Sequence, residues 1–385
     1  MDGGGGYRIE VGGALANVAR GDWDRLANPD PAVYDPFVSW DFLEALEAAG
    51  CVAPEAGWGP RHLLLRGADG RLAGAMPLYL KGHSYGEYVF DHAWADALHR
   101  AGGRYYPKLL SAAPFTPVTG RRLLASDGEA RAALLGGAVE AARRLGVSSL
   151  HLNFLPGPQC EEAQAAGLLP RAGVQFHFAN PGYRDFQDFL STLSSSRRKS
   201  LRKERERACA GLEISAKRGA EITEADWDFF FACYMDTGAR KWGSPYLNRA
   251  FFSLLGARLG PRVVLFLASR QGRPIAAALN LLGGDCLYGR YWGRLEDQEF
   301  LHFELCYYQA MDMAMALKLP RVEAGAQGEH KLARGYAPVT TWSAHWIAHP
   351  GLRRAVADYL QAERPAIAEE IEQLSDYTPF RKGEA

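Results

Sequence analysis

Residues 61–80 read RHLLLRGADGRLAGAMPLYL, and residues 263–282 read VVLFLASRQGRPIAAALNLL. Each stretch holds an apolar run, a turn with a glycine and a second apolar run. This order is typical of an antiparallel hairpin whose turn needs a positive φ. Gly70 and Gly272 align at an offset of 202 positions, and an arginine follows each glycine. The sequence therefore predicts a weak internal repeat.

A helix and a further strand follow each hairpin. Apolar residues recur at helical spacing over 129–145 and 302–317, and strand-like runs follow at 147–154 and 321–324. These later parts align at an offset of 172, so the first copy carries an insertion of about 30 residues within 91–126. Chance similarity of two hairpins is the alternative, and the shared order of helix and strand argues against it.

The chain is therefore predicted to be α/β, of the α+β kind, with two similar domains and a C-terminal helix. Each domain is expected to be a mixed, mostly antiparallel sheet flanked by helices. The first domain is predicted at 7–179 and includes the insertion. The second is predicted at 180–349 and the helical tail at 350–385.

Three further helical segments are predicted. Asp185 is expected to cap a helix that runs to about Cys209 and opens the second domain. Residues 224–259 form an aromatic, helical segment. The tail is expected to form an amphipathic helix that is interrupted at Pro365.

Composition limits the function classes. The 385 residues are 48% apolar and 23% charged, which excludes extensive disorder. No apolar run approaches the roughly 18 residues of a membrane span, and the glycine-rich start is unlike a secretory signal. We therefore expect a cytoplasmic protein without a membrane partner. Basic and acidic residues balance at 44 each, so contact with nucleic acid requires a local patch.

One such patch lies on the predicted basic helix. Seven positive charges fall within residues 197–207. Arginine forks suit phosphate oxygens, and tRNA, a nucleotide-linked substrate and a free carrier are the three candidate sources of phosphate. The alternative is a solvated helix held by Glu–Arg pairs. The predicted phosphate-binding residues are Arg197, Arg198, Lys199, Arg202 and Arg205.

A reactive cluster is predicted at the end of the second domain, on a strand end and the following loop. Glu329 or His330 is expected to act as a general base, while Lys331 or Arg334 would stabilise an oxyanion or hold an anion. The alternative is a loop whose charges pair among themselves. Two further substrate-binding candidates in this cluster are Glu323 and Gln327.

Other candidates lie outside that loop. His302 and Glu304 are placed in the catalytic group because they open the helix beside it. Cys306 is expected to pack inward, and neither metal binding nor thiol catalysis is predicted. In the insertion, aromatic and cationic residues suit an anionic organic acceptor, with structural packing as the alternative. The remaining substrate-binding candidates are Arg290, Trp292, Lys108, Thr116, Arg121, Lys241 and Trp242.

The stretch Arg290–Leu295 comes nearest to the phosphate-binding loop of an acyl-CoA site. Such a loop needs a small residue where this sequence has Leu295, and the acidic residues that follow would repel a pyrophosphate. The favoured interpretation is that Gly293 is a turn glycine. No cofactor is therefore predicted as required.

Several blocks resemble the signature of the FemAB-like family, labelled peptidoglycan biosynthesis/recognition. They lie at 289–293, 301–309, 323–336, 106–108, 114–120 and 194–199. The family is similar to the Fem aminoacyltransferases, so the resemblance implies two tandem GNAT-like domains. It also implies transfer of an acyl or aminoacyl group, with acyl-CoA or aminoacyl-tRNA as donor, to a small or nucleotide-linked amine or hydroxyl acceptor.

Three alternatives stay open. The first is a CoA-dependent N-acyltransferase. The second is a non-catalytic recognition module for cell-wall precursors or nucleic acid. The third is a family scaffold recruited to another reaction in a small-molecule biosynthetic pathway.

Overall fold

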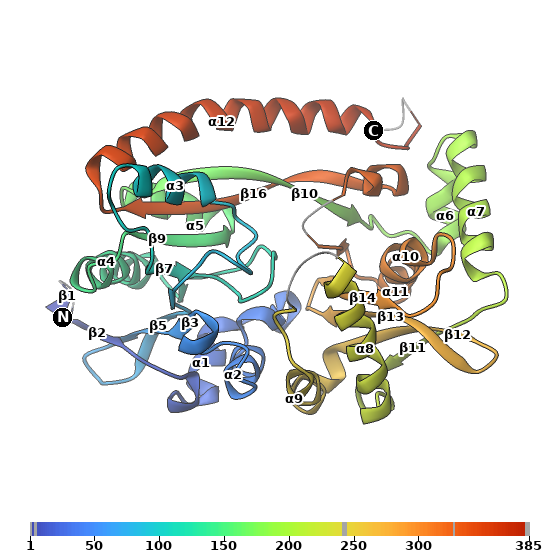
Figure 1. Cartoon of the computed structure of the whole chain (residues 1–385), viewed down its shortest axis with the longest axis horizontal. Coiled ribbons are helices and arrows are strands. Elements are labelled where there is room, and N and C mark those ends of the chain that lie inside the picture. The colour runs from blue at the N-terminus through green and yellow to red at the C-terminus, as the bar shows by residue number, and fades with distance from the viewer. Residues whose placement is uncertain (1, 4–5, 241–244, 326–327, 382–385) are drawn as a thin grey trace. The chain divides into compact units, whose positions relative to one another are not determined.

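A computed structural model describes residues 2–3, 6–240, 245–325 and 328–381 (Figure 1). The chain forms two compact units. Unit 1 consists of Met1–Asp30, Phe37–Val174 and Thr340–Glu369, and unit 2 of Pro31–Pro36, Gln175–Val339 and Glu370–Ala385. Among the described residues, no helix combines the length and apolar character that crossing a bilayer demands.

The compact units differ from the predicted domain limits in two segments. Residues 340–369 belong to unit 1, although 340–349 falls within the second predicted domain, and Pro31–Pro36 belongs to unit 2. The predicted limits themselves stay a prediction.

Unit 1 holds two groups of strands. The first is antiparallel, in the order β1 (Asp2–Gly3), β2 (Tyr7–Val11), β4 (Leu63–Arg66), β5 (Leu72–Met76) and β8 (Leu124–Ala125). The second has the order β16 (Tyr336–Ile347), β9 (Ser149–Leu155), β7 (Lys108–Ser111), β6 (Tyr79–Lys81) and β3 (Trp58–Pro60). In this second group β7 and β9 pair in parallel, and the other neighbours pair antiparallel.

The helices of unit 1 cover these strands. They are α1 (Arg20–Ala27), α2 (Trp40–Ala48), α3 (His92–Arg100), α4 (Gly128–Arg144) and α5 (Gly157–Ala165). Helix α4 packs on both strand groups, and Leu134, Leu135 and Ala138 on its inner face join a continuous apolar core. Burial of such side chains is the main favourable contribution to folding.

Unit 2 is built on one sheet. Its strands follow the order β11 (Glu213–Arg218), β12 (Val263–Arg270), β13 (Arg273–Leu282), β14 (Cys286–Arg294), β15 (Arg321–Glu323) and β10 (Leu169–Ala179). Its helical segments are α6 (Phe186–Ser191), α7 (Ser195–Cys209), α8 (Glu224–Arg240), α9 (Arg249–Leu259), α10 (Leu301–Phe303), a π-helical turn (Glu304–Tyr308), α11 (Gln309–Ala316) and a 3₁₀ turn (Glu329–Arg334). Helix α12 (Pro350–Asp376), like β10 and β16, has residues in both units.

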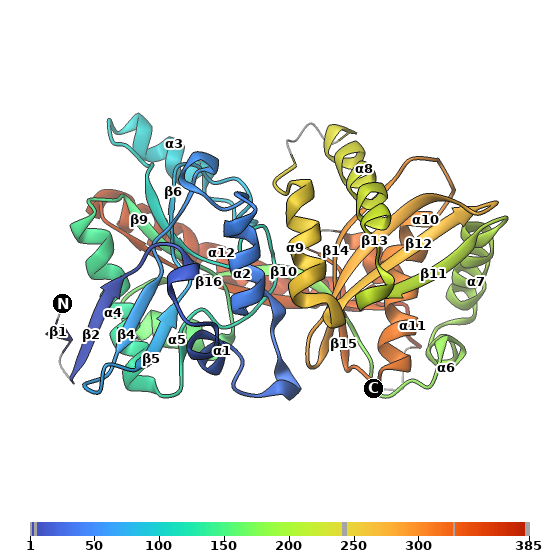
Figure 2. The same cartoon turned by 90° about the horizontal axis from the view of Figure 1, so that it is seen from below.

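Helices cover both faces of the unit 2 sheet (Figure 2). Tyr291 of β14 packs on Tyr234 of α8, with ring centroids 5.3 Å apart, whereas its neighbour Trp292 packs on His302 of α10 at 4.6 Å. Successive strand residues point to opposite faces, so α8 and α10 lie on opposite sides. The sheet is therefore a central layer between two helical layers.

Each unit contains two parallel strands joined by a helix, which confirms the predicted order. The pairs are β7 and β9, joined by α4, and β14 and β15, joined by the segment from α10 to α11. The turn glycines are also confirmed, because Gly70 has a φ of 79° and Gly272 a φ of 74°.

The insertion lies earlier than predicted. Three residues connect β13 to β14, whereas residues 82–107 connect β6 to β7. Strand β7 itself falls inside the predicted insertion of 91–126. The aromatic and glycine-rich composition of that stretch hid a short, fully buried strand.

Two helix predictions need correction. Asp185 does cap a helix, accepting from the Asp188 N–H at 2.8 Å, but this helix ends at Ser191 and α7 begins separately. The tail is one helix that continues through Pro365. The turn before this proline is anchored, because Arg171 holds Glu363 with two hydrogen bonds of 2.9 and 2.8 Å.

Candidate functional site

The candidate site lies where β14 and β15 separate. Tyr288 and Glu323 form the last pair of the parallel ladder, after which β15 ends while β14 continues along β13 to Arg294. In open α/β sheets ligands bind outside the carboxyl ends of parallel strands. The residues that follow Glu323 are therefore at the position where a ligand is expected to bind.

His330 is exposed and lies on the turn that follows β15. Its Nε2 lies 2.9 Å from the Tyr307 hydroxyl, and burial together with Arg334 and Lys331 lowers the pKa of His330. The ring is therefore neutral at pH 7. Gly328 has a φ of 124°, and a Cβ there would lie 2.4 Å from the His330 ring, so only glycine permits this arrangement.

Aromatic rings surround this imidazole. Its centroid lies 5.5 Å from Phe303, 5.8 Å from Tyr307 and 6.2 Å from His302, and the His302 ring contacts Trp292. We call these five residues the imidazole–aromatic cluster: Trp292, His302, Phe303, Tyr307 and His330. Its exposed His330, its half-buried Trp292, His302 and Phe303, and its two imidazoles suit an organic substrate with a proton to lose.

Two cations of the predicted loop are engaged by the protein itself. Lys331 is buried and donates to the Gly325 carbonyl at 2.8 Å, and burial lowers the pKa of its ammonium to about 8. Arg334 grips Glu204 of α7 at 2.9 and 2.7 Å, donates to the His330 carbonyl at 2.6 Å and lies over the Phe303 ring. Arg334 therefore fixes the turn that carries His330.

Glu323 is buried on the other side of the sheet. Its parallel partner Tyr288 lies on the same face as Tyr291, which packs on α8. Neither carboxyl oxygen accepts a hydrogen bond from any described residue, and burial raises the pKa of Glu323 to about 7. An Arg321 guanidinium nitrogen and the His177 Nε2 each lie 3.8 Å from one oxygen, and only the arginine is charged, because burial lowers the pKa of His177 to about 3. The structure thus separates Glu323 from His330, which the sequence had grouped together.

Glu304 does not reach the cluster as a base. It is fully buried and accepts from Arg205 at 3.0 and 2.7 Å and from Gln309 at 2.8 Å. Both carboxyl oxygens are occupied by these donors, and the side chain is closed to solvent. Its predicted catalytic role therefore finds no geometric support, whereas His302 does lie in the cluster. Cys306 is half-buried rather than packed inward.

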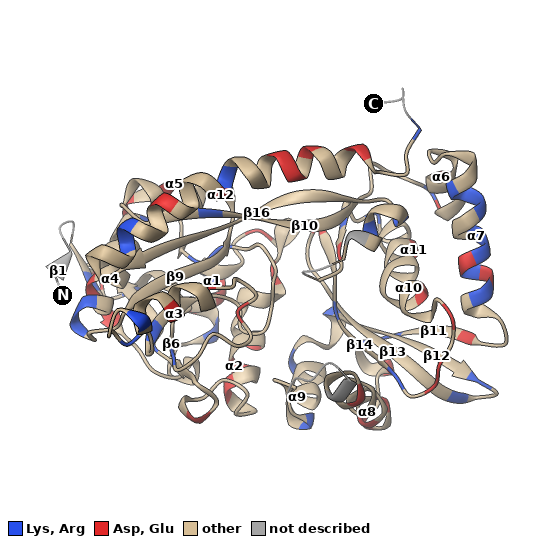
Figure 3. Ribbon diagram, turned by 45° about the horizontal axis from the view of Figure 1, so that its top comes forward, with Lys and Arg blue, Asp and Glu red and all other residues tan. Residues whose placement is uncertain are grey.

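Basic residues recur along helix α7, with acidic residues between them (Figure 3). Arg197, Lys199 and Arg202 are exposed, and Arg202 donates to Gln187 at 2.8 Å. Arg198 donates to the Leu193 carbonyl at 3.1 Å. Arg205 differs, because Glu304 and Asp312 hold its guanidinium. It lies on the inner face of α7 and is not part of the exposed basic surface.

The other predicted residues are dispersed. Thr116 donates to the Pro114 carbonyl at 3.0 Å, and Arg121 donates to the carbonyls of Leu26 and Ala27. Lys108 is buried in a polar network of unit 1. Arg290 lies at the bulge of β14 with its guanidinium 5.2 Å from the Tyr291 ring. Outside the described residues lie Gln327, Lys241, Trp242 and the side chain of Glu329.

Gly293 is neither a turn glycine nor part of a phosphate loop. It lies within β14, and a Cβ there would be 2.1 Å from the Cys233 carbonyl oxygen of α8. Its role is to let a strand and a helix approach closely. Among the described residues, no group of three or more His, Cys, Asp or Glu side chains converges as metal ligands do.

Sequence reasoning missed Tyr307 and His177. Tyr307 lies five residues after His302, a spacing that a regular α-helix does not bring to one face. The π-helical turn over Glu304–Tyr308 shifts it toward His330. His177 stands in a strand of alternating polarity, and burial lowers its pKa to about 3.

Comparison with known families gives one match over nearly the whole chain. The FemAB-like model, described as peptidoglycan biosynthesis/recognition, matches residues 14–382. No curated protein matches significantly. The resemblance that the sequence blocks suggested is thereby confirmed.

Solved structures share the fold at low identity. FemX is 12% identical with a TM-score of 0.56, covering 91% of this chain and 100% of its own. The C-terminal domain of a putative lysylphosphatidylglycerol synthetase from Agrobacterium fabrum is 9% identical with a TM-score of 0.54, covering 89% and 95%. A tandem GNAT protein from the clavulanic acid pathway is 13% identical with a TM-score of 0.45, covering 89% and 99%. The predicted α/β fold class is confirmed.

Proposed function

We propose, on the premise that the chain belongs to the FemAB-like family, that it transfers an acyl or aminoacyl group to an amine or hydroxyl acceptor. The acceptor attacks an activated ester or thioester directly, without a covalent enzyme intermediate. His330 supplies the observation that carries this proposal. Its imidazole is neutral, oriented and exposed at the carboxyl end of a parallel strand.

The chemistry needs a proton acceptor, because an attacking amine or hydroxyl must lose a proton. When Nε2–H of His330 donates to the Tyr307 hydroxyl, Nδ1 keeps its lone pair for that proton; this tautomer is part of the proposal. Tyr307 then orients the base, and Arg334 fixes the base's backbone from α7. Trp292 and His302 provide the adjoining aromatic surface for a substrate.

The donor is proposed to be an aminoacyl ester such as aminoacyl-tRNA, with no required cofactor. The exposed cations of α7 suit a phosphodiester backbone. A CoA donor has less support, because the stretch Arg290–Leu295 lies almost entirely in strand β14 and its Gly293 packs on α8. The acceptor is proposed to be a cell-wall precursor, small or nucleotide-linked, and the reaction to be cytoplasmic. The family's description supports the link to peptidoglycan.

A single-turnover assay tests the proposal. The parent is offered aminoacyl-tRNA or acetyl-CoA, each with a nucleotide-linked muropeptide, and transfer of labelled acyl group is followed. His330→Gln should lower kcat by roughly 10²–10⁴-fold, as expected when a general base is lost. Tyr307→Phe should lower kcat less, since it removes only the orienting hydroxyl. The control is His99→Gln, an exposed histidine on α3 of unit 1.

Two outcomes contradict the proposal. Full turnover by folded His330→Gln would show that this imidazole is not the base. Binding of the muropeptide by the parent without turnover from either donor would identify a recognition module instead. Turnover with acetyl-CoA alone would favour the CoA-dependent alternative.

The proposed donor site is tested separately on α7. Arg198→Glu with Arg202→Glu should weaken tRNA binding and lower the slope of log K against log salt by about 0.9 for each lost phosphate contact. The matched control is Arg143→Glu with Arg144→Glu, two exposed arginines at the end of α4. Equal tRNA affinity in both double variants would show that the cations of α7 are solvated and do not contact tRNA.

A further inference from the structure

One face of the second strand group in unit 1 is polar although it is buried. Lys81 pairs with Lys108 across β6 and β7, and His151 of β9 pairs with His345 of β16. The parallel pairing of Leu110 with His151 places these residues on the same side of the sheet. We call this surface the polar face: Lys81, Lys108, His151, Asn153 and His345. None of the five is more than 2% exposed.

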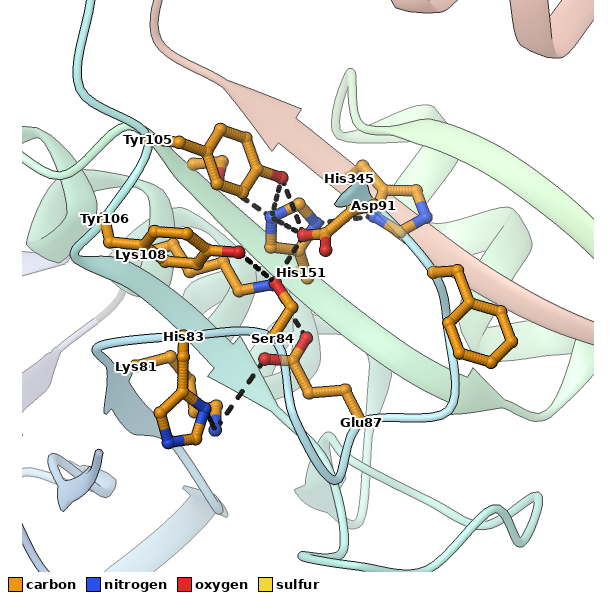
Figure 4. A network of polar contacts seen from close by, with 12 residues as sticks. Lys81, His83, Ser84, Glu87, Asp91, Tyr105, Tyr106, Lys108, His151 and His345 are labelled. Atoms are coloured by element: carbon orange, nitrogen blue, oxygen red, sulfur yellow. Dashed lines mark hydrogen bonds and ion pairs between the residues drawn. The ribbon is translucent and has the colours of Figure 1, made fainter. Parts of the chain in front are cut away.

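Residues 82–107, between β6 and β7, cover this face and supply its acids (Figure 4). Lys108 Nζ donates to Ser84 Oγ at 2.8 Å, to Glu87 Oε2 at 2.7 Å and to Asp91 Oδ2 at 2.5 Å. Tyr105 also donates to Asp91, at 2.7 Å. The covering segment and the polar face therefore form one connected network with two lysines and two carboxyl groups.

Hydrogen-bond acceptors exceed donors in this network. Among the described residues, no donor bonds to Glu87 Oε1, Asp91 Oδ1 or Asn153 Oδ1. The Asn153 amide donates to the Glu87 carbonyl at 3.5 Å, so its unbonded oxygen lies beside the same segment. Lys81 Nζ is 3.8 Å from Glu87 Oε1, beyond hydrogen-bond range. Against these three oxygens stand two unbonded groups that can donate, the Trp58 indole N–H and the Tyr79 hydroxyl.

We propose that the polar face and its covering segment form a binding site for a primary ammonium group. Three acceptor oxygens match the three N–H bonds of an alkylammonium. Each buried acceptor left without a donor costs about 1–3 kcal/mol, so a donor-rich ligand is favoured. An anionic group, which the sequence had suggested for this insertion, would add acceptors to a site where unbonded acceptor oxygens already outnumber unbonded donors.

The covering segment also provides apolar surface for the rest of such a ligand. Tyr85 and Phe90 flank Glu87 along the chain and are 63% and 62% exposed. We propose that these two rings contact the apolar part of the ligand. The proposed ligand is therefore a primary amine on an alkyl or arylalkyl chain. This inference is independent of the transfer chemistry assigned to unit 2.

Binding should tighten with rising pH. Lys81 faces Glu87, Lys108, Asp91 and His83, and burial lowers the pKa of Lys81 to about 7. Burial raises the pKa of Glu87 to about 7. Between pH 6 and 8 both groups lose protons, which removes a competing cation and adds a carboxylate. The ligand keeps its charge, because alkylammonium groups titrate near pH 10.

Thermal melting of the full chain with phenethylammonium chloride tests the site. The melting temperature should rise with ligand concentration and rise more at pH 8 than at pH 6. Tetramethylammonium chloride and potassium chloride at equal ionic strength should give no such rise, since they carry charge without N–H donors. An equal rise with either salt would overturn the ammonium assignment, and no rise with any amine would mean that water alone fills the network.

Asn153→Ala provides the variant. It removes one unbonded oxygen and the 3.5 Å hydrogen bond to the Glu87 carbonyl, but none of the partners of Lys108, so the variant should fold. Its affinity for phenethylammonium, measured by calorimetry, should fall at least about tenfold. Glu140→Gln, on the exposed side of α4, is the control and should bind as the parent does. Unchanged affinity in Asn153→Ala would refute the proposed site.

Discussion

His151 in unit 1 and Glu323 in unit 2 occupy equivalent places. Each is the third residue of the strand that follows a crossover helix, and each pairs with a parallel neighbour. Around His151, lysines, carboxyl groups and a second imidazole join in one network. Glu323 has two oxygens that no described donor reaches. The same strand position thus belongs to a connected polar network in unit 1 and carries a buried acid without a described hydrogen-bond donor in unit 2.

The difference comes from the connections and not from the strands. In unit 1 the long connection 82–107 brings Ser84, Glu87 and Asp91 over the face. In unit 2 three residues connect the corresponding strands, so no such partners are supplied. In unit 2 the proposed base His330 lies instead on the turn after β15, on the opposite face of the sheet. An inserted segment can therefore change what a shared sheet position does.

The largest expected difference between the units is in how much stability is lost when a buried lysine is replaced. Lys108→Met leaves Glu87 and Asp91 buried without their shared cation, which should cost about 3–5 kcal/mol. Lys331→Met removes one hydrogen bond and one poorly solvated charge, so the free energy of unfolding should change by less than about 1 kcal/mol. Urea unfolding at pH 7 measures both. Similar losses in the two variants would contradict the contrast between the units.

Glu323→Gln should change the pH dependence of stability. Because the folded protein raises the pKa of Glu323 from 4.5 to about 7, the parent binds that proton more tightly when folded. Parent stability relative to the variant should therefore fall from pH 4.5 to 7, by up to about 3 kcal/mol, and stay level above. Unfolding of both proteins across pH 4 to 8 measures this. A difference that grows in the parent's favour with pH would show that Glu323 is ionised and stabilising.

Arg334 and Glu204 should be coupled by about 1–3 kcal/mol in a double-mutant cycle of Arg334→Met and Glu204→Gln. Since Arg334 holds the carbonyl of His330, its loss should lower kcat more than it raises KM. Arg334→Lys should restore part of kcat. A rise in KM with unchanged kcat would assign Arg334 to holding a substrate anion, which was the expectation from sequence.

Cysteine substitutions should have the smallest effects. Cys306→Ser, at a half-buried position, should change stability by less than about 1 kcal/mol and keep most activity. Cys160→Ser in unit 1, where the thiol is 4% exposed, should cost more. Thermal melting and the transfer assay measure both. Loss of all turnover in folded Cys306→Ser would indicate covalent catalysis.

The spacing of apolar residues predicted secondary structure correctly where neighbouring residues determine it. The hairpins with Gly70 and Gly272, helix α4 and strand β15 were predicted from spacing, because strand and helix periods are written in adjacent residues. The prediction that helix α12 is interrupted at Pro365 was wrong, since contacts of Glu363 hold the preceding turn. Local rules cannot include such distant contacts.

The candidate site was predicted in part. His330 and His302 were named from sequence and lie in one cluster, but Tyr307 was missed because a π-helical turn alters the helix register. Glu304 and Arg205 were assigned to chemistry, yet they pair with each other. Charge alone does not show which partner, solvent or ligand a side chain meets.

By itself the sequence determined the family, the mixed α/β class and the repeated hairpin, helix and strand. The tertiary structure decided which polar side chains are buried and which partners they contact. Alternation in β9 places His151 and Asn153 on one side of a strand, as it would for a surface strand. Only the fold shows that residues 82–107 cover that side. The physical reason is that the strand period fixes which residues share a face, whereas burial and pairing depend on segments far away in the chain.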